Sequence, residues 1–333
     1  MKLRLLAFTQ RGYDVARTLG EKLGGEASRC GRECTLEGWT AEGFHTGDNL
    51  IFVGAVGIAV RAIAPFVKSK TSDPAVVAVD EGGTYAIPLL SGHLGGANDL
   101  ARQIARVSQA QAIITTATDV RGLFPVDQWA RQQGLRVENP EKIKAVSAKV
   151  LAGETVFIKS DVPISGAPPE GVALGEEGDV DVEISCHPRA ETALHLLPAA
   201  MVLGVGCKRG TPKQALEQAF AELLAREGLS PLAVGKVCSI DLKKDEPGLL
   251  AFCNEHSLSL ETYSAGELAA VPGEFTASDF VRRVTGVDNV CQRAAALGSA
   301  GGAERLLGEK YQREGVTMAL ALGDVWLDWR IYE

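Results

Sequence analysis

Apolar and polar positions alternate along the chain with periods that change from one stretch to the next. In residues 1–126, short apolar runs predict buried strands, and segments with an apolar residue every three or four positions predict helices. The strands are expected at 2–8, 50–55, 75–80, 85–89 and 112–116, and the helices at 13–23, 58–67 and 96–107. Strands that alternate with helices indicate a parallel or mixed sheet covered by helices.

The pattern changes near residue 127 and again near residue 200. Between them, one helix is expected at 141–151 and strands at 155–159 and 181–186, while Gly, Pro and acidic residues predict a solvated loop over 165–183. From residue 200, strands are expected at 201–205, 234–240, 258–263 and 316–322, and helices at 246–256, 278–284 and 290–297.

Another helix is expected to begin at Thr211, with Thr211 as its N-cap, Pro212 at its first position and Gln214 as the capping-box partner. The predicted fold class is α/β. Two alternating α/β domains, 1–126 and 200–333, with parallel or mixed sheets, are joined by a smaller, variable middle region, 127–199.

Composition and charge narrow the classes of function. The 333 residues have ordinary globular composition and a net charge of -8, which argues against nucleic acid or an anionic membrane as a partner. The longest apolar stretch, 50–64, is too short and interrupted to span a membrane, and the N-terminus lacks a signal-peptide pattern. Seven cysteines, an odd number, favour free thiols in a reducing cytoplasm.

The densest run of reactive residues and glycines lies around two of the expected strands. DEGG (80–83) follows the strand at 75–80, and SGHLGGAN (91–98) joins the next strand to a helix. Glycines let the backbone approach a ligand, N–H groups at a helix start bind anions, and His93 titrates near neutral pH. The candidate catalytic residues are His93, Glu81, Asp80 and Ser91, and the candidate substrate contacts in this run are Gly92, Gly95, Gly96 and Asn98. A helix cap and ordinary turn glycines remain the alternative.

Two further glycine loops, 54–57 and 204–210, join an expected strand to a helix beside basic residues. Neither matches a dinucleotide-binding or Walker A fingerprint, but both suit carboxylates or phosphates; tight turns with solvated charges explain them equally well. Thr115, Thr116 and Asp119 lie at the end of a strand, where we expect them to face a cleft at the carboxyl edge of the sheet, and they are further candidate substrate contacts. The candidate substrate contacts in these loops are Gly57, Arg61, Gly204, Gly206, Lys208, Arg209, Gly210 and Thr211.

Longer runs carry a family resemblance. Residues 57–98 together with TTATD (115–119) closely resemble the amino-terminal part of the CbiG family of cobalt-precorrin-5A hydrolases. The carboxy-terminal part of that family, which resembles CobE-type proteins, is matched by LGVGCKRGTP (203–212), CSIDLKKDEPGL (238–249), SDFV (278–281), GVDNVCQRAA (286–295) and VTMALA (316–321).

The resemblance implies an enzyme of anaerobic cobalamin biosynthesis that opens the δ-lactone of cobalt-precorrin-5A with water and releases acetaldehyde. It implies no protein-bound metal or other cofactor, because the substrate carries the cobalt, and neighbouring enzymes of the pathway as partners. On this hypothesis the lactone lies at the loop 91–96, where His93, Glu81 or Asp80 activates water and the N–H groups of Gly95 and Gly96 hold the oxyanion. A non-catalytic carrier of corrin intermediates is the alternative.

Overall fold

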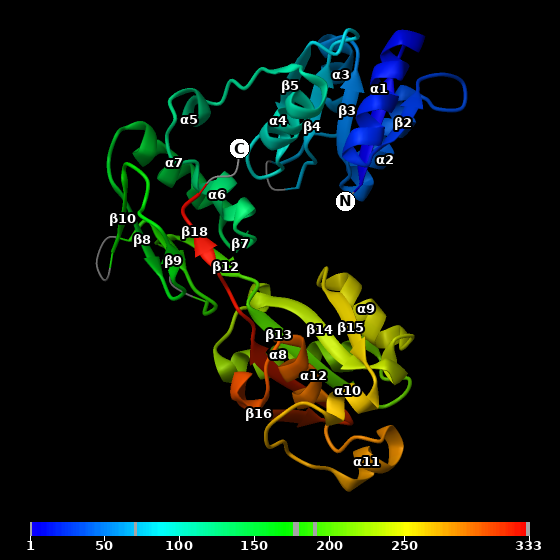
Figure 1. Cartoon of the computed structure of the whole chain (residues 1–333), viewed down its shortest axis with the longest axis vertical. Coiled ribbons are helices and arrows are strands. Elements are labelled where there is room, and N and C mark those ends of the chain that lie inside the picture. Colours follow the sequence, from blue (N-terminus) through cyan, green and yellow to red (C-terminus); the bar gives the residue numbers. More distant parts are fainter. Residues whose placement is uncertain (1, 70–71, 176–179, 189–191, 331–333) are drawn as a thin grey trace.

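Three sheets organise the chain in the computed structural model, which describes residues 2–69, 72–175, 180–188 and 192–330 (Figure 1). Each sheet is built mainly from one of the three stretches that the sequence pattern separates, and we call each sheet with the helices that pack on it a body, numbered in chain order. The predicted α/β class is confirmed. No helix among the described residues is long and apolar enough to cross a membrane.

The first sheet has six strands in the order β2-β1-β3-β4-β5-β6. The strands are β1 (Leu3–Ala7), β2 (Glu26–Arg29), β3 (Asn49–Val53), β4 (Val76–Val79), β5 (Tyr85–Leu90) and β6 (Gln111–Ala112). Helices α1 (Gln10–Leu23) and α4 (Ala97–Ser108) cover one face, and α2 (Leu36–Thr46) and α3 (Val56–Ile63) cover the other. Central strands are apolar at consecutive positions because both faces are covered: Leu5 packs on the α1 side and Leu6 on the α2 side.

The direction of β5 decides where the candidate residues lie. Strands β1 to β4 are parallel, whereas β5 runs antiparallel to β4, with Val79 opposite Ala86 and Val76 opposite Leu90. The loop after β4 and the loop after β5 therefore lie at opposite edges of the sheet. The strand expected at 112–116 ends at Ala112, and α5 (Ala117–Val120) follows.

The second sheet has the order β10-β8-β11-β12-β7, with only β7 antiparallel to its neighbour. Its strands are β7 (Leu135–Val137), β8 (Val156–Ser160), β10 (Val172–Leu174), β11 (Val182–Ile184) and β12 (Leu194–Pro198). Helices α6 (Val126–Gln132) and α7 (Ile143–Leu151) pack on it around the fully buried Trp129. The expected loop 165–183 contains β10 and the start of β11, and its residues 176–179 lie outside the described part.

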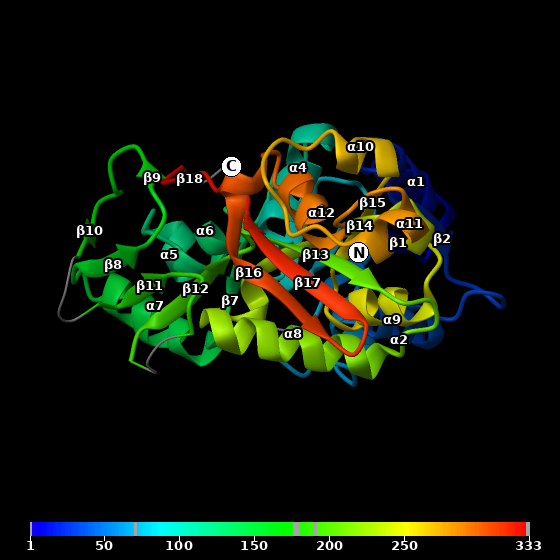
Figure 2. The same cartoon turned by 90° about the horizontal axis from the view of Figure 1, so that it is seen from below.

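The third sheet has the order β15-β14-β13-β17-β16. Its strands are β13 (Met201–Cys207), β14 (Val234–Ile240), β15 (Ser259–Tyr263), β16 (Leu306–Arg313) and β17 (Val316–Leu322). Figure 2 shows α8 (Lys213–Glu227) and α9 (Pro247–Glu255) on one face and α10 (Ala265–Ala269) and α12 (Cys291–Gly298) on the other. The short helix α11 (Asp279–Thr285) follows α10.

Helix α8 begins later than the capping pattern predicts. Pro212 is its N-cap and Lys213 its first residue, and no side chain caps it. Thr211 does not cap the helix because its hydroxyl donates to the carbonyl of Lys208 at 2.8 Å and closes the preceding turn. The capping-box prediction at Thr211 is therefore wrong.

The chain does not end within the third body. After β17 it returns to the second body, where β18 (Leu327–Asp328) pairs with β9 (Ile164–Ser165) and Trp329 stacks on Trp129 at 5.3 Å between ring centroids. Leu327 and Trp329 are buried in the core of the second sheet. The expected unit 200–333 thus includes a tail that completes the core of its neighbour, because this places its apolar side chains out of water.

Candidate active site

Loops after β1, β3 and β4 meet at the carboxyl edge of the first sheet, the edge at which open α/β sheets bind ligands. Strand β3 lies between β1 and β4. The hydroxyl of Thr9, after β1, donates to Oε1 of Glu81, after β4, so these loops are joined across the end of β3. Thr9 also caps α1 by accepting the N–H of Gly12.

The two acidic residues after β4 have different surroundings. Asp80 accepts backbone N–H groups from Gly82, Thr84 and Tyr85 at 3.0, 2.7 and 2.6 Å. Asp80 therefore fixes the turn, and most of its acceptor positions are taken by the backbone. Glu81 is exposed, and its Oε2 accepts no hydrogen bond from the described residues.

The loop after β3 offers donors to an anion. Ala55 is the N-cap of α3 without a side-chain hydrogen bond, and the N–H groups of Val56 and Gly57 have no partner among the described residues. The Arg61 guanidinium lies beside this helix start, where a Cβ added at Gly57 would be 3.7 Å from its Nη1. Arg61 forms no ion pair in the described part of the chain. A cation beside free N–H groups at a helix start suits a carboxylate.

His93 lies at the other edge of the sheet, enclosed by carboxylates. Its Nε2 is 2.8 Å from Asp119 Oδ2 and its Nδ1 is 3.0 Å from Asp127 Oδ1, and all three side chains are largely buried. Burial alone lowers the pKa of His93, but the hydrogen bonds and charges of Asp119 and Asp127 outweigh it and raise the pKa to about 9. His93 is thus a doubly hydrogen-bonded imidazolium near neutral pH, a form that suits a structural ion pair better than a general base for water.

Part of the backbone around His93 is also occupied. The N–H of Gly96 donates to the carbonyl of His93, so Gly96 is not a free oxyanion donor. Ser91 donates its hydroxyl to the carbonyl of Asp73 at 2.9 Å. The loop winds tightly, since a Cβ added at Gly95 would be 2.3 Å from Cβ of Ser91 and one at Gly92 would be 2.9 Å from Asn98 Oδ1. These contacts explain the glycines by packing.

The other residues predicted near His93 do assemble there. Buried Asn98 donates to Thr116 Oγ1 and to Asp119 Oδ2, both at 3.1 Å, and Arg102 donates to Asp119 Oδ1 at 2.6 Å. Burial pushes the pKa of Asp119 upward, but the hydrogen bonds from His93 and Arg102 more than offset it, so the pKa lies below its ordinary value. Thr115 is exposed outside this network. Asn98, Thr116 and Asp119 contact each other rather than an open cleft.

In the third body, close packing requires glycine at two of the predicted substrate contacts. Gly204 and Gly206 lie within β13, where a Cβ would come 1.8 Å from the carbonyl oxygen of Cys291 and 2.6 Å from Oγ1 of Thr317, respectively. Gly204 therefore lets α12 pack directly on β13. Packing explains both glycines, and ligand contact at them stays a prediction.

The loop after β13 does present cations at a carboxyl edge. Lys208 and Arg209 are exposed, and the loop is anchored because the N–H of Gly210 donates to Glu246 Oε1 at 2.6 Å. Lys243 donates to the other oxygen of Glu246 at 2.9 Å and, with burial opposing it, lowers the pKa of this carboxyl. Lys208 and Arg209 remain candidate carboxylate contacts.

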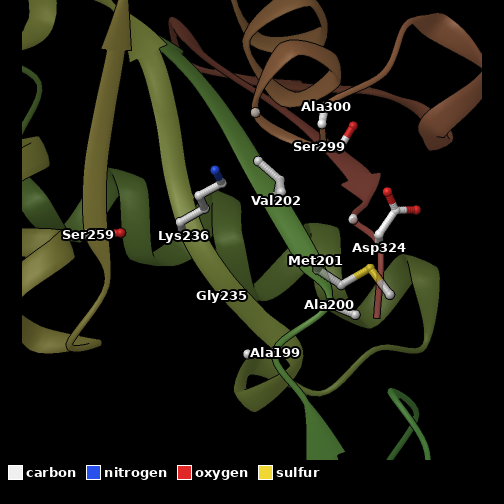
Figure 3. Close-up of a pocket in the computed structure, with 12 residues that line it drawn as sticks. Ala199, Ala200, Met201, Val202, Gly235, Lys236, Ser259, Ser299, Ala300 and Asp324 are labelled. Atoms are coloured by element: carbon white, nitrogen blue, oxygen red, sulfur yellow. The ribbon is translucent and has the colours of Figure 1, made fainter. Parts of the chain in front are cut away.

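A pocket of about 470 Å³ lies at the opposite, amino edge of the third sheet (Figure 3). The charged residues that line it are Lys236 and Asp324, and both are paired, with Glu261 and Arg305 respectively, at 2.8 Å. This pocket therefore offers no free cation to an anionic ligand. Nowhere in the described ranges do three His, Cys, Asp or Glu side chains gather as metal ligands.

Comparison with known proteins identifies the family. The descriptions "Cobalamin synthesis G N-terminal", "Cobalamin biosynthesis central region" and "Cobalamin synthesis G C-terminus" match residues 38–119, 124–201 and 201–321. A cobalt-precorrin-5A hydrolase of Salmonella typhimurium is 36% identical over 296 residues, which are 84% of this chain and 84% of that protein. The chain belongs to the cobalamin synthesis G (CbiG) family.

Other relatives agree with the family assignment. A cobalt-precorrin-5A hydrolase of Priestia megaterium is 33% identical over 306 residues, covering 84% of this CbiG-family chain and 79% of that protein. The protein CobE of a Sinorhizobium species is 32% identical over 124 residues, 37% of this chain and 80% of CobE. The resemblance predicted from the long sequence runs is confirmed.

Two residues at the carboxyl edge of the first sheet escaped the sequence analysis. Thr9 holds Glu81, and Arg11 lies near the same turn, since a Cβ added at Gly82 would be 3.9 Å from its Nη2. Both follow the first predicted strand. A signal was available there, because a threonine just after a strand and before a helix is a typical N-cap at this edge.

Proposed function

We propose that this CbiG-family protein is a cobalt-precorrin-5A hydrolase. The observation that carries the proposal is the extent of its similarity to two proteins of that name, 36% and 33% identical over 84% of the chain. The reaction is the opening of the δ-lactone by water, followed by release of acetaldehyde and formation of cobalt-precorrin-5B. Its seven cysteines are free thiols, which suits the cytoplasm as its compartment.

We assign the chemistry to the carboxyl edge of the first sheet. Glu81 has a free oxygen and is held by Thr9, so it suits the role of general base for the attacking water. The N–H groups of Val56 and Gly57 suit the oxyanion that forms on the lactone carbonyl. This assignment keeps Glu81 among the catalytic candidates and replaces His93.

The reaction then balances as two steps. Water attacks the lactone carbonyl and its proton passes to Glu81. The ring C–O bond breaks as Glu81 gives that proton to the departing oxygen, which leaves an alcohol and a carboxylic acid that ionises to a carboxylate in solvent. Glu81 then takes the alcohol proton, which forms the C=O bond of acetaldehyde while the carbon–carbon bond to the macrocycle breaks. The conjugated ring accepts that electron pair.

Binding of a polycarboxylate macrocycle requires separated cations. Arg61 and Arg11 lie at the first sheet's carboxyl edge, and Lys208 and Arg209 at that of the third. Charge-assisted hydrogen bonds from such groups favour carboxylates. The cobalt enters with the substrate, and we propose that the protein itself needs no cofactor.

The test is catalytic turnover. Substoichiometric protein incubated with cobalt-precorrin-5A should release many equivalents of acetaldehyde, detected with an alcohol dehydrogenase coupled assay. The existence of CobE, which corresponds to the carboxy-terminal part alone, motivates the alternative of a carrier for corrin intermediates. A carrier would release at most one equivalent, and that result would refute the hydrolase.

A further inference from the structure

A balanced cluster of charges lies where the first body meets helix α6. His93, Asp99 and Arg102 come from the loop after β5 and from α4, Asp119 comes from α5, and Asp127 and Arg131 come from α6. With His93 protonated, three cations face three carboxylates. We call these six residues the His93 latch.

The latch carries the polar connection between the two bodies. Within the described residues, every hydrogen bond or ion pair that joins residues 2–112 to residues from 124 onward involves His93 or Asp99. Besides the Asp127 contact, Arg131 Nε donates to the His93 carbonyl at 3.0 Å and its guanidinium pairs with Asp99. Gln128 and Gln132 also donate to Asp99, at 2.9 and 3.1 Å.

The same helix holds the returning tail. Trp129 of α6 donates its Nε1–H to the carbonyl of Asp328 at 2.8 Å and stacks on Trp329. Gln133, just after α6, accepts the N–H of Asp328 at 3.0 Å. Helix α6 thus links the latch on the first body to the tail that returns from the third sheet.

We propose that the His93 latch is a charge-dependent contact between the first and second bodies: protonated His93 holds the first body on α6, and loss of the His93 proton releases the first body. A neutral imidazole carries one N–H, so it donates to Asp119 or to Asp127 but not to both, and the buried cluster is left with an excess negative charge. The inference is independent of the proposed function.

The direction of the pH dependence follows from the pKa of His93. Because the pKa is raised from its ordinary value of 6.5 to about 9, the contact between the two bodies is fully formed below pH 6.5 and is lost as the pH rises through about 9. The charged groups that face His93 are Asp99 and Arg102 on α4, Asp119 on α5, and Asp127 and Arg131 on α6.

The experiment uses the full chain and two readouts. Small-angle X-ray scattering measures the maximum dimension, and trypsin measures access to Arg121, the one Lys or Arg in residues 113–125. Wild-type protein should be compact and resistant at pH 7 and should expand near pH 9. His93→Gln should be expanded at pH 7, with cleavage after Arg121 faster by at least about tenfold, and its dimensions should not change up to pH 10. His45→Gln, in an exposed histidine of α2, is the matched control and should behave as wild type.

A second variant tests the same proposal if His93→Gln does not fold. Asp127→Asn keeps the histidine but removes one carboxylate, so the pH of expansion should fall by on the order of one unit. The NMR signal of His93 among the five histidines should titrate with the expansion. The proposal is overturned if wild type does not expand near pH 9, if His93→Gln expands at the same pH as wild type, or if Asp127→Asn leaves that pH unchanged.

Discussion

Asp80 and Glu81 are neighbours in the chain, yet their hydrogen bonds give them different roles. Asp80 accepts three backbone N–H groups, which makes it the residue that shapes the turn. Glu81 receives a single hydrogen bond from the Thr9 hydroxyl and keeps an oxygen free. The difference arises because the turn folds back over Asp80, whereas Glu81 points to the loop after β1.

The first prediction concerns Glu81→Gln. Removing a general base costs about 10²- to 10⁴-fold in rate, so acetaldehyde release should fall within this range in kcat, while KM changes little. Steady-state assay of acetaldehyde measures both constants. Glu21→Gln, in an exposed glutamate of α1, should keep wild-type kcat. If Glu81→Gln also keeps it, the site assignment is wrong.

A second prediction at this scale concerns Gly204. A Cβ there would lie 1.8 Å from the carbonyl oxygen of Cys291, so α12 must move away from β13 in Gly204→Ala. Overpacking of this kind costs about 1–3 kcal/mol. Urea unfolding should show this loss, and Gly31→Ala, where an added Cβ meets nothing within 4 Å, should not. Equal stability of the two variants would contradict the packing explanation.

At the scale of elements, sequence periodicity predicted the strands whose residues are buried at consecutive positions. It missed features that depend on contacts between elements. Strands β14 and β17 were predicted with their observed bounds because consecutive apolar residues face helices on both sides. Helix α2 was missed, since Gly38 and Gly43 weaken its pattern. The sequence did not predict that His93 and Glu81 lie at opposite edges of the sheet, because the direction of β5 depends on strand pairing and not on local pattern.

The returning tail leads to a prediction for Trp329. This side chain is 6% exposed and stacks on Trp129, whereas Trp326, three residues earlier, is 78% exposed. Trp329→Ala should lower the free energy of unfolding by about 3–5 kcal/mol through lost burial. Trp326→Ala should change it by less than about 0.5 kcal/mol. Denaturant unfolding followed by circular dichroism measures both changes. A similar effect of the two variants would show that the returning tail does not stabilise the core of the second sheet.

At the scale of the whole molecule, two sheets present exposed cations at their carboxyl edges, Arg61 in the first and Lys208 and Arg209 in the third. The sequence predicted these cations as substrate contacts, and that role stays a prediction. The structure places Arg61 exposed on α3, and Lys208 and Arg209 exposed in the loop after β13. How the edges share one ligand could not be predicted, since it depends on the arrangement of the bodies. A macrocycle that carries several carboxylates has enough negative charges to bind more than one of these cations.

If one substrate molecule contacts both edges, Arg61→Ala and Arg209→Ala should each raise KM with little change in kcat. A hydrogen bond to a charged group contributes about 1.5–3 kcal/mol, so each variant should raise KM by about tenfold or more, and the double variant should show the product of the two effects. Arg106→Ala, in an exposed arginine of α4, is the control and should leave KM unchanged. If Arg209→Ala leaves KM unchanged while Arg61→Ala raises it, the substrate binds to the first body alone, and the third body has a different role.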